Sequence, residues 1–73
     1  MTTLGERIKL LREELGMSKT ELAEIMGCDL EDIEEWECNR KVPHILQIKP
    51  LSVALETTTD YLLGVKERKN SII

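Results

Sequence analysis

The sequence predicts an all-α fold, and three observations carry this prediction. Apolar residues recur at the spacing of helical turns, most clearly from residue 4 to residue 15. Two Ser/Thr-x-x-Glu patterns, at residues 3 and 18, are typical of helix starts. No stretch alternates apolar and polar residues as a strand does. We therefore expect a compact bundle of five helices with short loops.

The first helix is expected over Thr3–Leu15. Thr2 or Thr3 can cap it, and Glu6 completes a capping box with Thr3. Gly16 stops this helix, because glycine accepts backbone conformations that end helices. The apolar face consists of Leu4, Ile8, Leu11 and Leu15.

Two short helices around a tight turn follow, over Ser18–Met26 and Leu30–Glu37. Ser18 and Glu21 form the second capping box, Gly27 can take a positive φ, and Asp29 can cap the next helix. The apolar positions of this unit are Leu22, Ala23, Ile25, Met26, Ile33 and Trp36, of which we expect Trp36 in the core. Such a pair is the outline of a helix-turn-helix unit, whose second helix often enters a DNA major groove.

A loop is expected from residue 38 to residue 43, with Asn39 in the left-handed region. Because proline cannot sit in an uninterrupted helix interior, the next regular helix should start near Lys49, with Pro50 in its first turn. Residues 45–48 would then form an irregular lead-in, and His44 a loop or cap residue. The expected inward residues of this helix are Leu51, Ala54 and Leu55.

Thr58 with Asp60 opens a last short helix that carries Tyr61 to Leu63 and is closed by Gly64. The polar segment 65–73 is expected to be a flexible tail. Ile72 and Ile73, at its end, are candidates for packing on a partner. Residues 1–64 are therefore expected to form one small domain.

Composition excludes several classes of function. The 73 residues, 41% of them hydrophobic, contain no apolar run of about 18 residues that could span a membrane and no signal-peptide pattern, so we expect a cytoplasmic protein. Cys28 and Cys38 bracket a helix and should lie about 15 Å apart, too far for a disulfide. With the single His44 they make a poor zinc site. The chain lacks a nucleophile–base pattern and a phosphate-binding glycine loop, so we expect no enzyme, no cofactor, no metal and no small-molecule substrate.

The third helix is unusually acidic. Six of the nine residues from Asp29 to Glu37 are Asp or Glu, and the formal net charge is −4. Two explanations need no function. Acids near the start of a helix stabilise it through the helix dipole, by about 0.3–1 kcal/mol each, and a run of charges can simply be a solvated face. The acids near its end lose that benefit, so a functional acidic surface stays open beside a solvated one.

The chain resembles the Cro/C1-type (XRE-like) helix-turn-helix family of phage and bacterial repressors. The resemblance lies in GERIKLLREELGMSKTELAE at 5–24, Gly27, Ile33, WE at 36–37, Pro43 and LSVALETTTDYLLG at 51–64. It implies a lambda-repressor-like five-helix DNA-binding domain with the helix-turn-helix at the second and third helices. It also implies a sequence-specific transcriptional regulator, of repressor type, that binds operator DNA as a homodimer. Arg12 and Glu37 match positions that pair in this family, a structural salt bridge.

The resemblance places DNA contacts on the second helix, the third helix and the loop after it. The matching positions are Ser18, Lys19, Thr20, Asp29, Leu30, Glu31, Asp32, Glu35, Asn39, Arg40 and Lys41. Lys19, Arg40 and Lys41 suit phosphates. A carboxylate can accept from cytosine N4, and Leu30 can contact a thymine methyl, but no side chain of the third helix can donate to guanine.

The acidic third helix leaves a second hypothesis open. Its carboxylates repel DNA phosphates, and at an effective dielectric near 20 each like-charge pair some 6–8 Å apart costs about 2 kcal/mol. The same surface would suit a basic protein partner, with Leu30 as an apolar anchor. The alternative function is therefore a protein-interaction module, such as an antirepressor or accessory factor.

Overall fold

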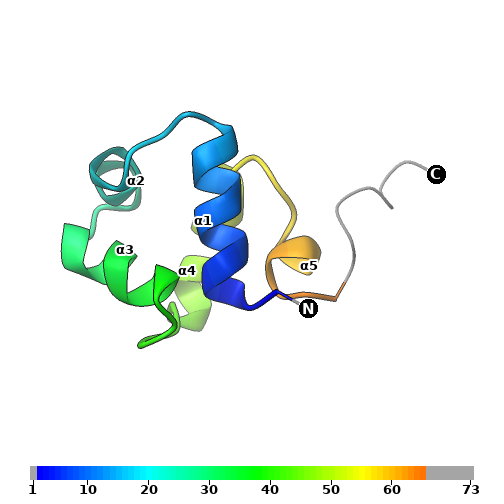
Figure 1. The fold of residues 1–73 in the computed structure, drawn as a ribbon. Helices are drawn as coiled ribbons and strands as arrows, with labels where there is room; N and C mark the ends of the chain where they lie inside the picture. Colours follow the sequence, from blue (N-terminus) through cyan, green and yellow to red (C-terminus); the bar gives the residue numbers. More distant parts are fainter. Residues whose placement is uncertain (1, 66–73) are drawn as a thin grey trace.

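The computed structural model describes residues 2–65, which form five helices (Figure 1). The helices are α1 (Leu4–Glu14), α2 (Lys19–Met26), α3 (Leu30–Glu37), α4 (Ile45–Ala54) and α5 (Thr59–Leu62). No strand occurs in this part of the chain. The predicted all-α class is confirmed.

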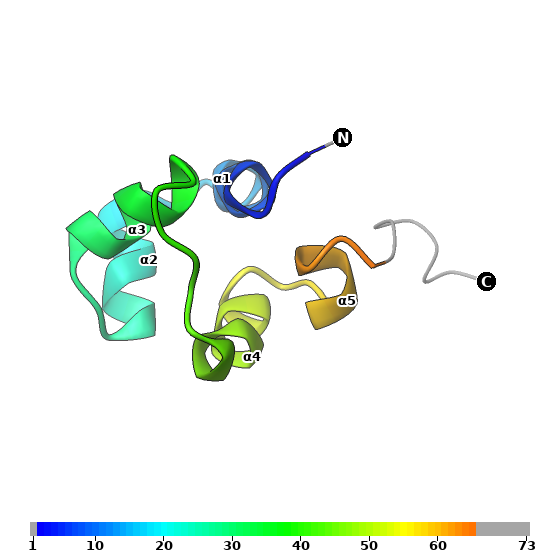
Figure 2. The ribbon, with the colours of Figure 1, turned by 90° about the horizontal axis from the view of Figure 1, so that it is seen from below.

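The helices surround one core. Figure 2 shows α1 and α4 on opposite sides of the molecule, with α2 and α3 at one end and α5 at the other. Helix α3 packs against α1 and α2, while α4 packs against α2 and α5. The α2–α3 unit therefore forms an end face of the bundle, and the remaining helices support it from behind.

Buried apolar side chains from every helix make the core. Ile8, Leu22, Ile33 and Leu51 are fully buried, and the prediction that Trp36 is a core residue is confirmed, with 4% of it exposed. Burying one such side chain contributes about 1.5–3 kcal/mol. The full set is Ile8, Leu11, Leu22, Ala23, Ile33, Trp36, Ile48, Leu51, Leu55 and Leu62. Leu15 and Ile25, expected on apolar faces, are instead 39% and 59% exposed.

The helix boundaries that rest on local signals are confirmed. The Thr3 hydroxyl accepts from the Glu6 N–H at 3.1 Å, and the Glu6 carboxylate accepts from the Thr3 N–H at 2.9 Å. Ser18 and Glu21 repeat this capping box at 3.0 and 2.8 Å. After α3 the chain turns through Asn39, whose φ is 63°. Thr58 caps α5 by accepting from the Tyr61 N–H.

The prediction for α4 was wrong. The helix begins at Ile45 and is continuous, so that Pro50 is its sixth residue and not part of its first turn. His44 starts it: its Nδ1 accepts from the Leu46 N–H at 3.1 Å, and Gln47 Oε1 accepts from the His44 N–H at 2.8 Å. The carbonyl of Leu46 receives no hydrogen bond from Pro50, because proline has no N–H. Leu46 is 77% exposed, so water can bond to its carbonyl instead.

Residues 65–73 were expected to form a flexible tail. Except for Val65, this segment lies outside the described residues, and so do Ile72 and Ile73. Among residues 2–65, no helix has the length and apolar character needed to span a membrane.

Candidate nucleic-acid interface

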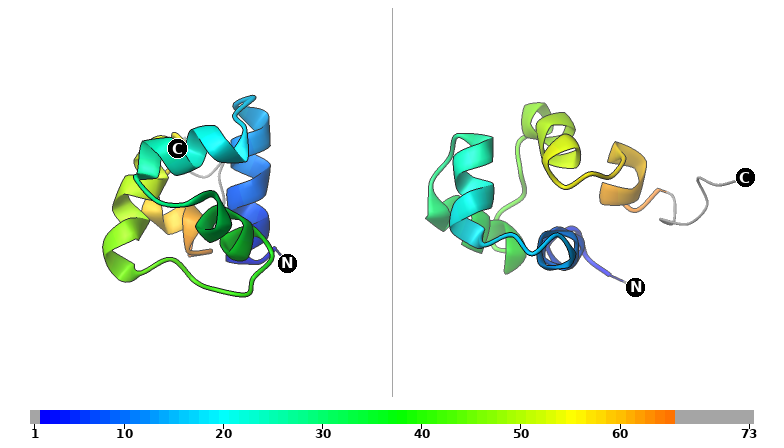
Figure 3. Two further views of the ribbon diagram at one scale, coloured as in Figure 1. Left: turned by 90° about the vertical axis from the view of Figure 1, so that its left-hand side faces the viewer. Right: turned by 90° about the horizontal axis from the view of Figure 1, so that it is seen from above.

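Helices α2 and α3 form a helix-turn-helix unit at the end face of the bundle (Figure 3). The turn between them begins at Gly27, which has a φ of 70°, a conformation that costs glycine little. Asp29 is the N-cap of α3, and its N–H donates to Asp32 Oδ2 at 3.3 Å. Ile33 and Trp36 anchor the inner face of α3 in the core, so the opposite face is turned to solvent.

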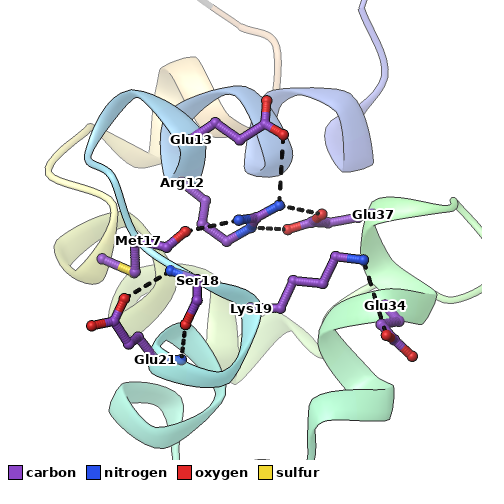
Figure 4. A network of polar contacts seen from close by, with 8 residues as sticks. All are labelled: Arg12, Glu13, Met17, Ser18, Lys19, Glu21, Glu34 and Glu37. Atoms are coloured by element: carbon purple, nitrogen blue, oxygen red, sulfur yellow. Dashed lines mark hydrogen bonds and ion pairs between the residues drawn. The ribbon is translucent and has the colours of Figure 1, made fainter.

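An ion pair fixes α3 against α1. The Arg12 guanidinium donates from Nε to Glu37 Oε2 at 2.7 Å and from Nη2 to Glu37 Oε1 at 3.1 Å (Figure 4). Its Nη1 donates to the Met17 carbonyl at 2.8 Å, just before α2. These hydrogen bonds to Glu37, reinforced by its charge, raise the pKa of Arg12 although burial opposes the shift. Arg12 therefore ties α1 to α3 and to the segment that leads into α2.

The outer face of α3 presents acids and one leucine. Asp29 and Glu31 are exposed, Leu30 is 40% exposed, and Asp32 and Glu35 are half-buried. The prediction that Leu30 points outward among acids is confirmed. The side chains on this face offer hydrogen-bond acceptors but no donors when the carboxylates are ionised.

Beside this face lies a hollow of about 590 Å³ where the basic residues gather. Lys19 Nζ lies 4.0 Å from Glu34 Oε2, and Arg40 Nη1 lies 3.7 Å from Glu35 Oε2. Lys41 also lines the hollow. The full lining is Lys19, Glu31, Asp32, Glu34, Glu35, Cys38, Arg40 and Lys41. The hollow thus brings together six of the predicted contact residues, namely Lys19, Glu31, Asp32, Glu35, Arg40 and Lys41.

Three other predicted contact residues, Ser18, Thr20 and Asn39, do not line the hollow. The Asn39 side-chain oxygen accepts from the Gly5 N–H at 3.2 Å and so joins the loop to α1. The Ser18 hydroxyl is used in the α2 cap, whereas Thr20 is exposed and has no hydrogen bond through its side chain within residues 2–65. A DNA-contact role for these three stays a prediction.

The sequence-based set of DNA contacts omitted Glu34 and Cys38. Glu34 pairs with Lys19 from fifteen positions away, so no local spacing rule indicates the contact. Both cysteines are free thiols, Cys38 exposed at the hollow and Cys28 half-buried. Burial raises the pKa of Cys28, and the charges of Asp32 and Asp29 add to the shift.

Comparison with known proteins gives concordant matches. A family model described as "Helix-turn-helix domain" matches residues 5–68. The P22 c2 repressor, solved in complex with a synthetic operator, is 30% identical, with a TM-score of 0.84 over 90% of this chain and 100% of that chain. The N-terminal DNA-binding domain of SinR from Bacillus subtilis is 33% identical, with a TM-score of 0.77 over 89% of this chain and 96% of that one.

A chain of the SinR–SinI complex is also 33% identical, with a TM-score of 0.79 over 89% of this chain. The present chain spans 64% of that chain. No curated protein matches the sequence. The family match over most of the chain and the shared fold at 30–33% identity lead to one conclusion: the chain belongs to the helix-turn-helix domain family, of the Cro/C1 repressor type.

Proposed function

We propose that the chain is a DNA-binding transcriptional regulator, of repressor type, that docks its α2–α3 face on duplex DNA. The observation that carries this proposal is the α2–turn–α3 unit itself, held at one end of the bundle by the Arg12–Glu37 pair. The similarity to the P22 c2 repressor in complex with a synthetic operator supports it. In proteins of this architecture the second helix of the unit lies in the major groove.

Phosphate contacts come from the residues around the hollow. Arg40 and Lys41 follow α3 and are exposed, and Lys19 stands at the start of α2 with 42% of its side chain exposed. Exposed hydroxyls at Ser18 and Thr20 can add hydrogen bonds to phosphate. These contacts supply affinity and position the protein but carry no sequence information.

Base contacts come from the outer face of α3, and its chemistry limits what it reads. Carboxylates such as Glu31 and Glu35 can accept from the amino groups of cytosine N4 and adenine N6, while guanine shows only acceptors in the major groove. Leu30 can contact a thymine methyl group. We therefore expect a half-site in which cytosine, adenine and thymine edges, and not guanine, face α3.

The regulator is proposed to act as a homodimer on a two-fold symmetric operator. Dimers of helix-turn-helix proteins bind two half-sites about one helical turn apart. Sedimentation equilibrium of the free chain and of its complex tests this point. A single chain per duplex at saturation would contradict it.

The Arg40→Ala/Lys41→Ala variant tests the proposed DNA contacts. We expect weaker binding to every duplex and a salt dependence that is less steep by up to about two, because two phosphate contacts are lost. The matched control is Lys9→Ala/Lys49→Ala, which removes two exposed charges from α1 and α4. Equal affinity of the Arg40→Ala/Lys41→Ala variant and the wild type would remove these residues from the interface.

A second function is favoured by one observation, the exposed Leu30 surrounded by carboxylates. An apolar anchor inside an acidic ring suits a basic protein partner, and SinR, a relative in fold, has been solved in complex with a protein. Pull-down with the wild type and with Glu31→Lys/Glu35→Lys tests this module function. Identical partners for both would count against it.

A further inference from the structure

We propose that Glu34 and Glu35 hold Lys19 and Arg40 in autoinhibitory ion pairs that open when the chain binds DNA. The inference rests on the proposed function and adds a regulatory contact to the same face. Of the three basic side chains proposed to contact phosphates, Lys19 and Arg40 already pair with a carboxylate of α3 in the free protein. The acids of α3 thus compete with DNA from within the chain.

The first pair links the two helices of the unit. Lys19 leaves the start of α2 and extends toward the middle of α3, where its Nζ lies 4.0 Å from Glu34 Oε2 (Figure 4). The exposed fractions of the two side chains are 42% and 49%, so solvent and a phosphate can reach both. The contact is therefore one that DNA can displace.

The second pair, Arg40 with Glu35, depends on backbone hydrogen bonds just after α3. The N–H groups of Arg40 and Lys41 both donate to the Glu35 carbonyl, at 2.9 and 3.3 Å. The loop is thereby folded back over the end of α3, and Arg40 Nη1 comes to 3.7 Å from Glu35 Oε2. Glu35 is the less exposed partner, with 30% of its side chain accessible against 72% for Arg40.

Lys41 is the remaining cation of the hollow. Within residues 2–65 it has no carboxylate within 4.0 Å, and Glu31 on the same lining likewise has no basic partner. The hollow thus contains two cations paired with carboxylates, one cation without such a partner, and two acids, Glu31 and Asp32, without a basic partner in the described part of the chain.

Because of these ion pairs, we expect DNA binding to be weaker, and its salt dependence less steep, than three unpaired cations would give. When Lys19 or Arg40 moves to a phosphate, condensed cations leave the DNA, but the released carboxylate attracts cations again. The two effects oppose each other. Exposed ion pairs of this kind change an equilibrium by at most about fivefold each, so they weaken DNA binding without abolishing it.

The experiment compares three single substitutions by fluorescence anisotropy with a randomised duplex pool. Glu34→Gln and Glu35→Gln each remove a paired carboxylate of α3. Glu24→Gln removes an exposed carboxylate of α2 that does not line the hollow and has no ion pair within residues 2–65. We expect the first two to raise affinity by about threefold to fivefold each and to steepen the salt dependence by up to one. Glu24→Gln should change affinity by less than about twofold.

A double-mutant cycle isolates the Lys19–Glu34 contact. Lys19→Ala should weaken binding less in the wild type than in the Glu34→Gln background, where Lys19 is free to contact phosphate. Equal gains from Glu24→Gln and Glu34→Gln, with no coupling in the cycle, would overturn the inference while DNA binding stands. Binding by Glu34→Gln or Glu35→Gln where the wild type fails would support both proposals. Failure of every variant to bind at about 50 mM salt would overturn both.

Discussion

Arg12 and Glu37, twenty-five positions apart, form a two-pronged ion pair between α1 and α3. Their side chains are 8% and 4% exposed, so the pair is largely shielded from water. The third guanidinium bond, to the Met17 carbonyl, adds the chain segment that leads into α2. This cluster therefore helps to hold the α2–α3 unit against α1, together with the core contacts of Ile33 and Trp36, and it gives the first prediction.

Arg12→Met should destabilise the fold by about 3 kcal/mol, because Glu37 then stays buried without a partner. Chemical denaturation followed by the fluorescence of the buried Trp36 measures the change. Lys9→Met, at an exposed position of the same helix, is the control. The double variant Arg12→Met/Glu37→Met should recover part of the loss. A loss below about 0.5 kcal/mol in Arg12→Met would show that the pair contributes little.

Gly5→Ala should destabilise the protein although alanine favours helices. Helix propensity alone predicts a gain of about 1 kcal/mol. The Cβ of an alanine, however, would collide with the Trp36 carbonyl and lie 2.6 Å from Asn39 Oδ1. We expect a net loss of about 1–3 kcal/mol, measured by denaturation. The sign decides the matter, since a gain would mean that α1 and α3 are not in close contact at this point.

Pro50→Ala should stabilise the protein. An alanine at this position can donate its N–H to the Leu46 carbonyl, which proline cannot do in the interior of α4. Part of the gain is lost because proline also restricts the unfolded chain. We expect a net increase of about 1 kcal/mol in the free energy of unfolding. Lys49→Ala, next to it and exposed, is the control, and a decrease for Pro50→Ala would contradict the continuous α4.

Cys28 should give the protein an alkaline sensitivity. Burial raises the pKa of its thiol above the ordinary value of 9.0, so the folded state favours the neutral thiol more than the unfolded state does. This contribution to stability is complete below the unfolded pKa and is lost as the pH rises through the folded pKa. Denaturation from about pH 8 to 10 should show a smaller fall for Cys28→Ala than for the wild type. Cys38→Ala, which removes the exposed cysteine, is the matched control.

The sequence predicted those parts of the fold that local signals determine. Capping boxes at Thr3 and Ser18 and the glycine at position 27 gave the bounds of α1 and α2 to within one residue, because these signals act over a few residues. For α4, Pro50 predicted a start near Lys49, whereas the structure shows a continuous helix that begins at a capping box of His44 and Gln47. The helix can continue through Pro50 because Leu46, whose carbonyl lacks a helical hydrogen bond, is exposed to water. That exposure depends on the tertiary structure.

The sequence indicated which residues to consider for the site but not how their charges pair. The resemblance pointed to Lys19, Arg40 and α3, and Lys19, Arg40 and part of α3 line one hollow. The pairing of Lys19 with Glu34 depends on the distance between two helices in space, which no sequence pattern gives. The same holds for the Gly5–Asn39 hydrogen bond, which joins α1 to the loop after α3.

The most direct test of the proposed function is an anisotropy titration of the wild-type chain against a randomised duplex pool, from about 50 to 200 mM salt, followed by selection of the bound fraction. We predict binding that weakens as salt rises, and an enriched sequence whose major-groove edges offer cytosine and adenine amino groups and thymine methyls. No binding at the lowest salt concentration, or bound duplexes without any enriched sequence, would contradict the assignment of a sequence-specific DNA-binding regulator.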